Sequence, residues 1–185
     1  MVGDKRYSVV VVGGGVVGIS TALAIQNLLG DYVQSVQVLS EKWSPDTTGD
    51  VSAGLIYPYL PGAETCPILL ERVFGQTMKF YENLIRNPNS GLFGVSLLSM
   101  YQLFGCEQCQ FPVGEEHFPV IRKLTGKELQ SLFDGQFASG LMATTFVAEP
   151  SLLLPYLMTQ FTKQVNRRNL KDQSEQFFCG LLTGW

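Results

Sequence analysis

The N-terminal part of the chain passes from a strand pattern to a helix pattern and back. Residues 7–12 form a run dominated by valine, which is typical of a buried parallel strand. Glycines at positions 13–15 end this run, and residues 16–29 then place apolar side chains at helical spacing. Residues 36–40 are again typical of a strand. This order predicts a βαβ unit with two parallel strands.

A long polar segment follows the predicted unit. Residues 43–61 are rich in threonine, glycine, proline and aspartate, so the segment is too broken for a helix and too long for a simple turn. Loops of this length in compact domains usually carry function. The segment is therefore a candidate for ligand binding.

The middle of the chain alternates longer helix and strand patterns. One helix is predicted from Pro67, which is tolerated in a first turn, to about Arg86. A second, short helix begins with a capping box of Thr125 and Glu128 and ends near Phe133. Strands are predicted over residues 95–104 and 140–148, a helix over 149–169, and turns or loops over 87–91 and 105–116. The chain ends in a polar stretch, 171–176, and an apolar tail, 177–185, that matches neither a helix nor a clear strand.

Composition narrows the class of protein. A chain of 185 residues with 45% hydrophobic residues can form one domain with a sizeable core. Its net charge of −3 gives no reason to expect nucleic acid as a partner. The longest apolar stretch near the start, residues 9–25, is interrupted by glycine and serine, so no membrane span is expected.

The cysteines do not predict a metal or redox centre. Cys106 and Cys109 form a C-x-x-C pair, but a zinc site would need a second ligand pair, and His117 is the single histidine of the sequence. A redox C-x-x-C usually opens a helix, whereas this pair lies in a predicted polar loop. We therefore expect no metal here.

The glycines after the first predicted strand form a dinucleotide-binding fingerprint, G-x-G-x-x-G. Gly13 permits the tight turn, Gly15 lets the backbone approach a pyrophosphate, and Gly18 lets helix and strand pack closely. The helix start at Val16 and Val17 offers N–H groups and a positive dipole end to phosphate. This context predicts a Rossmann-like βαβ unit, although a glycine-rich turn without a ligand is the alternative, and the fingerprint does not separate FAD from NAD.

Two further features fit a dinucleotide ligand. Glu41 ends the second predicted strand, where a carboxylate can accept hydrogen bonds from the ribose hydroxyls. In the polar loop, the hydroxyls of Thr47 and Thr48 suit phosphate and ribitol oxygens, and the small pair at 53–54 permits close approach to a flat ring. An ordinary polar loop is the alternative interpretation.

The residues that carry these features also match a known family. VVVVGGGVVGISTALAI, SPDTTGDVSAGLIYPYL, IRKLTGKEL and TTFVAEPSLLLPYL together resemble the D-amino-acid oxidase and D-aspartate oxidase family over residues 7–169. The TTGDVSAGL block is the specific part of the resemblance, because many flavin and nicotinamide enzymes share the glycine motif.

The resemblance implies FAD as the cofactor and an α/β fold, in which a Rossmann-like FAD-binding domain is joined by part of an interleaved α+β substrate domain. Residues 1–170 would form this domain, incomplete at its C-terminal side, and residues 171–185 would be a divergent tail that departs from the family's next strand in the cofactor sheet. The resemblance also implies three sets of cofactor contacts. Glu41 and Lys42 would contact the adenosine portion, and Thr47 and Thr48 the phosphate and ribityl region. Ala53, Gly54 and Leu55 would lie against the flavin.

The resemblance also implies a reaction, the oxidation of a small-molecule D-amino acid to a 2-oxo acid, ammonia and hydrogen peroxide. The implied substrate is D-aspartate or a neutral D-amino acid, and the 45–48 segment resembles the D-aspartate branch more closely. Tyr57 occupies a position where amino-acid-specific members tend to have a polar amide. A homodimer is compatible with the family, and its members are commonly peroxisomal, but no targeting tripeptide ends this chain, so a cytoplasmic location is the alternative.

The departures from the family leave other hypotheses open. Family members are much longer, and the arginine and tyrosine segments that grip their substrate fall outside the matching region, so no catalytic residue can be assigned. A catalytically inactive FAD-binding or regulatory fragment is therefore the second hypothesis. An NAD-dependent dehydrogenase is the third, and the threonine-rich loop after Glu41 argues against it.

Overall fold

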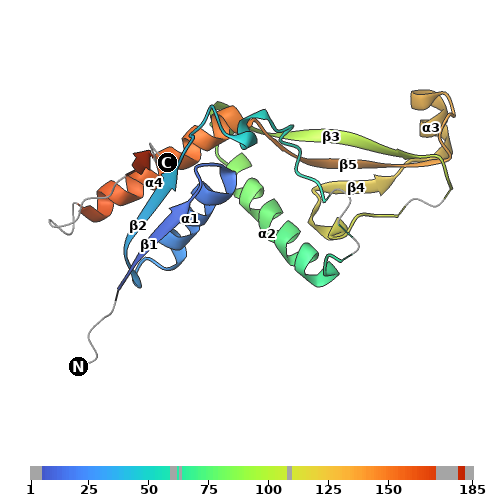
Figure 1. Ribbon diagram of the computed structural model, residues 1–185. Helices are drawn as coiled ribbons and strands as arrows, with labels where there is room; N and C mark the ends of the chain where they lie inside the picture. Colours follow the sequence, from blue (N-terminus) through green and yellow to red (C-terminus); the bar gives the residue numbers. More distant parts are fainter. Residues whose placement is uncertain (1–5, 59–61, 63, 108–109, 170–178, 182–185) are drawn as a thin grey trace. The chain divides into compact units, whose positions relative to one another are not determined.

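The computed structural model describes residues 6–58, 62, 64–107, 110–169 and 179–181. It divides into two compact units, of which the first combines residues 1–53 with 149–185 and the second comprises residues 54–148 (Figure 1). The first unit is thus built from two separated parts of the chain. The C-x-x-C interpretation depends on Cys109, which lies outside the described residues.

The first unit contains the predicted βαβ arrangement. Strand β1 (Tyr7–Val12) leads into helix α1 (Val16–Leu28), and strand β2 (Val33–Ser40) returns parallel to β1. The second strand starts earlier than the sequence pattern predicted, because buried Val33 already pairs with Tyr7 at the far end of the ladder. The mixed α/β class with a Rossmann-like start is confirmed.

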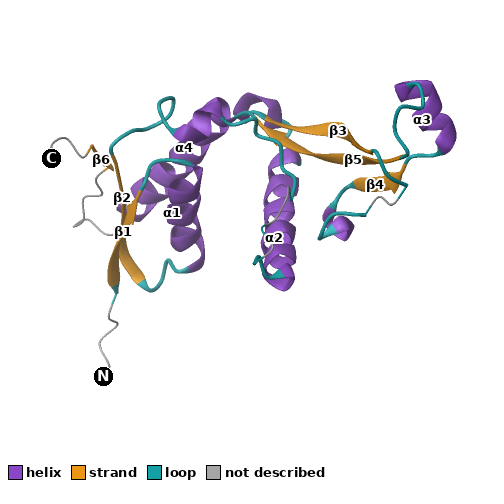
Figure 2. Cartoon of the chain, turned by 45° about the vertical axis from the view of Figure 1, so that its right-hand side comes forward, coloured by secondary structure: helices purple, strands orange, loops and turns teal. Residues whose placement is uncertain are grey.

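A third strand corrects the expectation for the tail. Strand β6 (Cys179–Leu181) runs parallel to β2, in register from Val38↔Cys179 to Ser40↔Leu181, and the sheet order is β1-β2-β6 (Figure 2). The apolar tail was predicted to lack a clear strand and to depart from the family's next strand in this sheet. A strand this short shows no periodicity of its own, so its pairing depends on the neighbouring β2.

The burial of β1 also differs from the prediction. A run of valines is typical of a parallel strand covered on both faces. Among the described residues β1 pairs with β2 alone and so lies at the edge of the sheet, and Val10 and Val12 are 51% and 76% exposed, in alternation with the less exposed Val9 and Val11. Within the described part of the chain, this strand is therefore covered on one face only.

The core of the first unit lies between helices α1 and α4 (Pro150–Asn169) and strand β2, whose Val33, Val36 and Val38 are buried. Helix α1 packs against α4, and Figure 2 shows both on the same side of the sheet. At one point along this contact, the Gln164 side-chain amide donates to Asn27 Oδ1 over 2.8 Å. Each helix buries apolar side chains spaced three or four positions apart. These are Ile19, Ala22 and Leu23 on α1, and Leu153, Leu154, Leu157 and Phe161 on α4.

The second unit is built on an antiparallel sheet of order β3-β5-β4, formed by β3 (Val95–Phe104), β5 (Ser139–Ala148) and β4 (Val120–Lys123). Strand β4 was not predicted, because its residues are mostly exposed and lack apolar alternation. Helix α2 (Pro67–Ile85) packs in the same unit, where the Tyr81 ring stacks on Phe146 with centroids 6.0 Å apart. No helix in the described residues is long and apolar enough to cross a membrane.

Shorter elements complete the second unit. Helix α3 (Gly126–Phe133) begins with the predicted capping box, in which the Thr125 N–H donates to Glu128 Oε2 over 2.8 Å and the Glu128 N–H donates to Thr125 Oγ1 over 3.3 Å. Two 3₁₀ helices, η2 (Ser90–Phe93) and η3 (Glu115–His117), begin within the predicted turn and loop segments and extend past their ends. These single turns have too few residues to reveal a period in the sequence.

Candidate dinucleotide-binding site

The turn between β1 and α1 requires glycine at two of the fingerprint positions. Gly13 has φ +121°, a conformation that side-chain-bearing residues rarely adopt, and its N–H donates to the Leu39 carbonyl over 2.7 Å. A Cβ at position 18 would overlap the carbonyl oxygen of Gly13. The first turn of α1 therefore lies directly against the strand end, as the fingerprint predicts.

Gly14, between the fingerprint glycines, also fixes this turn. Its buried N–H donates to Ser40 Oγ over 2.8 Å, and Ser40 Oγ donates to the Lys42 carbonyl over 2.6 Å. A Cβ at position 14 would lie 2.8 Å from both the Lys42 oxygen and a Trp43 ring carbon. Sequence reasoning missed Gly14 and Ser40, since neither the variable position of the fingerprint nor a serine at a strand end indicates this contact.

The N-terminus of α1 is open to an anion. Gly15, its N-cap, is extended at φ −82° and ψ −175°, no side chain caps the helix, and its first turn contains no acidic residue. The first intrahelical bond runs from the Ile19 N–H to the Gly15 carbonyl over 3.0 Å, so the N–H groups of Val16, Val17 and Gly18 precede the helical ladder. A Cβ at Gly15 would meet nothing within 4 Å, so the backbone there borders open space. This is the geometry of a phosphate site.

A groove of about 680 Å³ lies over this turn, within the size range of sites for small molecules and cofactors. It brings together every predicted contact residue from Gly13 to Thr48. Its lining residues are Val11, Val12, Gly13, Gly15, Val16, Val17, Gly18, Thr21, Ser40, Glu41, Lys42, Asp46, Thr47, Thr48 and Gly49. The glycine turn, the acid at the end of β2 and the threonine loop thus share one surface.

The threonine loop is held by Asp50. The loop contains a 3₁₀ helix, η1 (Thr48–Val51), and Asp50 accepts hydrogen bonds from Ser44 Oγ over 2.6 Å, from Thr47 Oγ1 over 2.5 Å and from the Thr47 N–H over 2.9 Å. The hydrogen bonds from Ser44 and then from Thr47 lower the pKa of Asp50. Because the Thr47 hydroxyl donates to Asp50, it can meet a ligand only as an acceptor, whereas Thr48 is exposed on the first residue of η1.

The predicted flavin contacts lie beyond the lining of this groove. Ala53 ends the first part of one unit, while Gly54 and Leu55 begin the other. Gly54 has φ +66°, a Cβ there would overlap the Ala148 carbonyl, and Ala148 donates its N–H to the Gly54 carbonyl over 2.9 Å. The local structure accounts for Gly54 by its close approach to β5, and a contact with the flavin stays a prediction for all three residues.

Tyr57, the residue singled out as a departure from the family, lies in the second unit. Its hydroxyl donates to the side-chain oxygen of Gln102, and its ring tilts against Phe118 with centroids 5.7 Å apart. Partial burial raises the pKa of the Tyr57 hydroxyl. An amide is thus present beside Tyr57, supplied by strand β3.

The chain belongs to the FAD-dependent oxidoreductase (DAO) family, whose sequence profile matches residues 8–166. FAD is therefore its cofactor, and the residues present fit that group: the α1 N-terminus is uncapped, and a Cβ at Gly15 would project into open space beside the groove. The predictions of family and cofactor are confirmed.

Among curated relatives, human D-aspartate oxidase is 33% identical over 151 residues, a match that covers 80% of this chain and 42% of the relative. D-amino acid oxidase of Dugesia ryukyuensis is 30% identical over 154 residues, covering 83% of this chain and 44% of that protein. The chain thus spans less than half the length of the curated relatives it matches.

Solved structures support the fold. L-α-glycerophosphate oxidase from Mycoplasma pneumoniae, solved in a dithionite-reduced form with FAD bound, superposes with a TM-score of 0.59 at 19% identity, covering 86% of this chain and 43% of that one. Iminodiacetate oxidase from Chelativorans sp. BNC1 superposes with a TM-score of 0.54 at 16% identity, covering 85% and 45% of the two chains. At these identities the likeness concerns the fold alone.

Proposed function

We propose that this chain provides the FAD-binding part of an oxidase that deaminates D-amino acids. The observation that carries the proposal is the groove that joins the glycine turn, Glu41 and the threonine loop, in a chain related to proteins named D-aspartate oxidase and D-amino acid oxidase. When bound, FAD would supply the redox chemistry: two electrons and two protons would leave the substrate Cα–H and amine, forming an imino acid, and would reach dioxygen to give hydrogen peroxide. Water then converts the imino acid to a 2-oxo acid and ammonia.

The chain's own residues would bind the cofactor in sequence along its length. The N–H groups at the start of α1 would hold the pyrophosphate, with the helix dipole favouring its negative charge. Glu41 would accept hydrogen bonds from the adenosine ribose, and Lys42 would lie along the adenosine portion. Thr47 and Thr48 would contact the phosphate and ribityl region, and residues 53–55 the flavin.

The substrate class is part of the proposal. D-aspartate and neutral D-amino acids are the two candidates, and the first is favoured by the 45–48 segment and by the relative named D-aspartate oxidase. Binding of the substrate carboxylate calls for an arginine, whose planar fork pairs with both oxygens. No arginine of this chain is assigned that role.

A second candidate function is FAD binding without turnover. The short match to the relatives favours it, because the matched region represents 42% of human D-aspartate oxidase and 44% of the D-amino acid oxidase from Dugesia ryukyuensis. In this form the chain would hold the cofactor or regulate a longer partner without oxidising an amino acid.

Two measurements separate these candidates. The purified full chain is incubated with FAD, freed of unbound flavin and examined by visible spectroscopy, with NAD as a competitor. Retained flavin supports both candidates, whereas no retention, or displacement by NAD, would contradict both. Peroxide release from D-aspartate or D-alanine, compared with the L-enantiomers, then supports the oxidase, and retained flavin without peroxide supports the second candidate.

Assembly and location are further parts of the proposal. Among the described residues β1 has one unpaired edge, and its Val10 and Val12 leave one face of the sheet apolar and open; both features favour association of two copies at this strand. Light scattering during gel filtration should then report a dimer, and a monomer at all concentrations would contradict it. From the family we expect peroxisomal localisation, with the cytoplasm as the alternative, and imaging of a tagged form of this chain would separate the two.

A further inference from the structure

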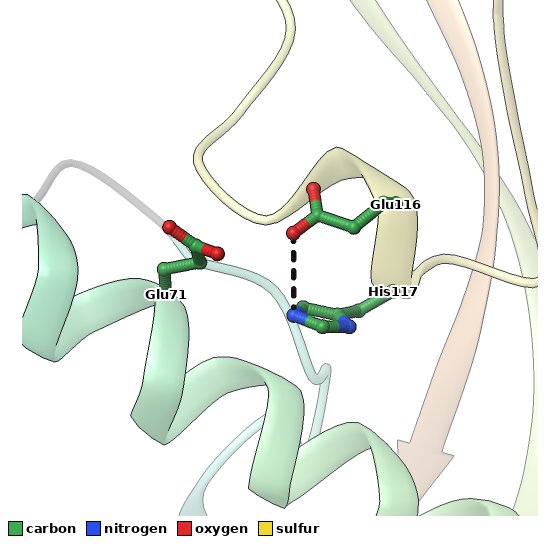
Figure 3. Close-up of side chains that lie close together, drawn as sticks. All are labelled: Glu71, Glu116 and His117. Atoms are coloured by element: carbon green, nitrogen blue, oxygen red, sulfur yellow. Dashed lines mark ion pairs between the residues drawn. The ribbon is translucent and has the colours of Figure 1, made fainter.

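The second unit contains a cluster of three side chains that could ligate a metal ion. Glu71 projects from α2, and Glu116 and His117 belong to η3 (Figure 3). One ligand atom from each residue lies within 4.8 Å of the other two. Both carboxylates are exposed and the imidazole is partly buried, so the cluster is open to an ion from solution.

The imidazole is seated directly on the backbone of α2. A Cβ at Gly75 would lie 2.5 Å from His117 Nε2 and 2.8 Å from Cε1, so the ring occupies the space that a side chain would fill. Glu71 lies four positions before Gly75, which places both on one face of the helix. The glycine therefore brings the imidazole to the helix face from which Glu71 projects.

The spacing within η3 suits two ligands of one ion. His117 Nε2 and Glu116 Oε1 are 3.4 Å apart, beyond the usual length of a charge-assisted hydrogen bond. Zinc ligands at ~2.0–2.1 Å in a tetrahedral arrangement are roughly 3.3–3.4 Å from each other. The two atoms thus have the separation that a shared ion would give them.

The side chains around the cluster favour a metal ion that accepts a nitrogen ligand. A cavity of about 360 Å³ adjoins Glu71 and His117 and leaves room for water, but Arg72 and Lys79 also line it. These cations repel all divalent ions alike, so the choice among ions depends on the ligand atoms, and Ca²⁺ and Mg²⁺ prefer sites built of oxygen alone. An imidazole with two carboxylates suits Zn²⁺ and its neighbours in the transition series.

We propose that Glu71, Glu116 and His117 form a binding site for a divalent transition-metal ion of the zinc type, with water completing the coordination. The ion would link η3 to α2, two segments distant in the sequence. This proposal does not rest on the FAD-dependent activity, since all three residues lie in the second unit. The spacing of the cysteines and of His117 predicts no metal site, because Glu71 joins this cluster only through folding.

The test is a titration of the purified full chain with Zn²⁺ by calorimetry and with Co²⁺ by visible spectroscopy. Glu71→Gln, Glu116→Gln and His117→Asn should each weaken binding by roughly tenfold or more, as expected for loss of a ligand. The matched controls make the same change at neighbouring carboxylates, Glu82→Gln on α2 and Glu115→Gln on η3, and should bind as the unsubstituted chain does.

A second variant separates coordination from folding. Gly75→Ala raises the intrinsic helix propensity of α2 but displaces the His117 ring, so metal affinity should fall while helix content is kept. Failure of the unsubstituted chain to bind either ion would overturn the proposal. Unchanged binding in His117→Asn, or a thiolate charge-transfer band with Co²⁺, would also overturn it by placing the ion on cysteine.

Discussion

A Cβ at position 18 would overlap the carbonyl oxygen of Gly13, so the first turn of α1 and the end of β1 are packed as closely as backbone allows. At Gly15 the opposite holds, because a Cβ there would meet nothing within 4 Å. The two fingerprint glycines therefore serve different purposes, one in packing and the other in ligand approach.

Alanine at these two positions should separate stability from FAD binding. Gly18→Ala should lower the free energy of unfolding by about 1–3 kcal/mol, because the added methyl group forces the helix away from the strand. Gly15→Ala should leave the melting temperature nearly unchanged but weaken FAD binding by more than tenfold, since its methyl group enters the phosphate site. Thermal unfolding without cofactor and fluorescence titration with FAD measure the two effects, and equal melting temperatures for both variants would contradict this assignment.

Substitution of Glu41 should affect the cofactor without affecting the fold. Glu41 is exposed at the end of β2, and a hydrogen bond to a charged group contributes about 1.5–3 kcal/mol. Glu41→Gln should therefore raise the dissociation constant for FAD roughly ten- to a hundredfold. Glu107→Gln, an equivalent charge change in the second unit, is the control. Equal affinity in the two variants would remove Glu41 from the adenosine site.

The Asp50 network should control the threonine loop. Asp50→Asn removes the charge that accepts from Ser44 and Thr47, so the loop should loosen and FAD affinity should fall several-fold. The pKa of Asp50 is lowered in the folded chain. Its contribution to the stability of the fold is therefore complete above the pKa of Asp50 in the unfolded chain, and it is lost as the pH falls through the pKa in the folded chain. NMR titration of the carboxyl group checks the sign, and a pKa above that of a free aspartate would contradict it. Asp31→Asn serves as the matched control for binding.

Acid should weaken the start of α3 in a defined range. Two hydrogen bonds from Arg122, of 2.6 and 2.9 Å, and then those from Thr125 lower the pKa of Glu128 to about 2. The stabilisation by this carboxylate is therefore present above its unfolded pKa and is lost as the pH falls toward 2. Arg122→Gln should raise the pKa of Glu128, whereas Lys127→Gln, which removes a charge without this pairing, should change it little. An unchanged titration in Arg122→Gln would show that the ion pair is not formed in solution.

The parts of the fold that the sequence predicted are those with local signals. The β1–α1–β2 unit has a hydrophobic period and a glycine turn, and α3 has a capping box, so each could be located without knowledge of its neighbours. Strands β4 and β6 have too few residues for a period and form only because a longer strand pairs with them. The exposure of Val10 and Val12 was missed for a related reason, since a valine run does not reveal whether another layer covers it.

The candidate site follows the same division. The fingerprint and the strand-end acid predicted residues that line one groove, because a βαβ unit brings its loops to one edge of the sheet. Ser40, which binds the Gly14 amide, and Asp50, which occupies the Thr47 hydroxyl, depend on hydrogen bonds that no spacing rule describes. Glu71 and His117 meet through tertiary packing at Gly75, so sequence spacing alone could not associate them.

Strand β1 leads directly into the glycine turn that lines the groove, so one short segment borders both the sheet edge and the cofactor site. If two copies associate along β1, as proposed above, and their pairing orders this turn, FAD will strengthen the association by the same factor by which the association strengthens FAD binding. The dissociation constant of the dimer, measured with and without FAD, would then report on the cofactor site.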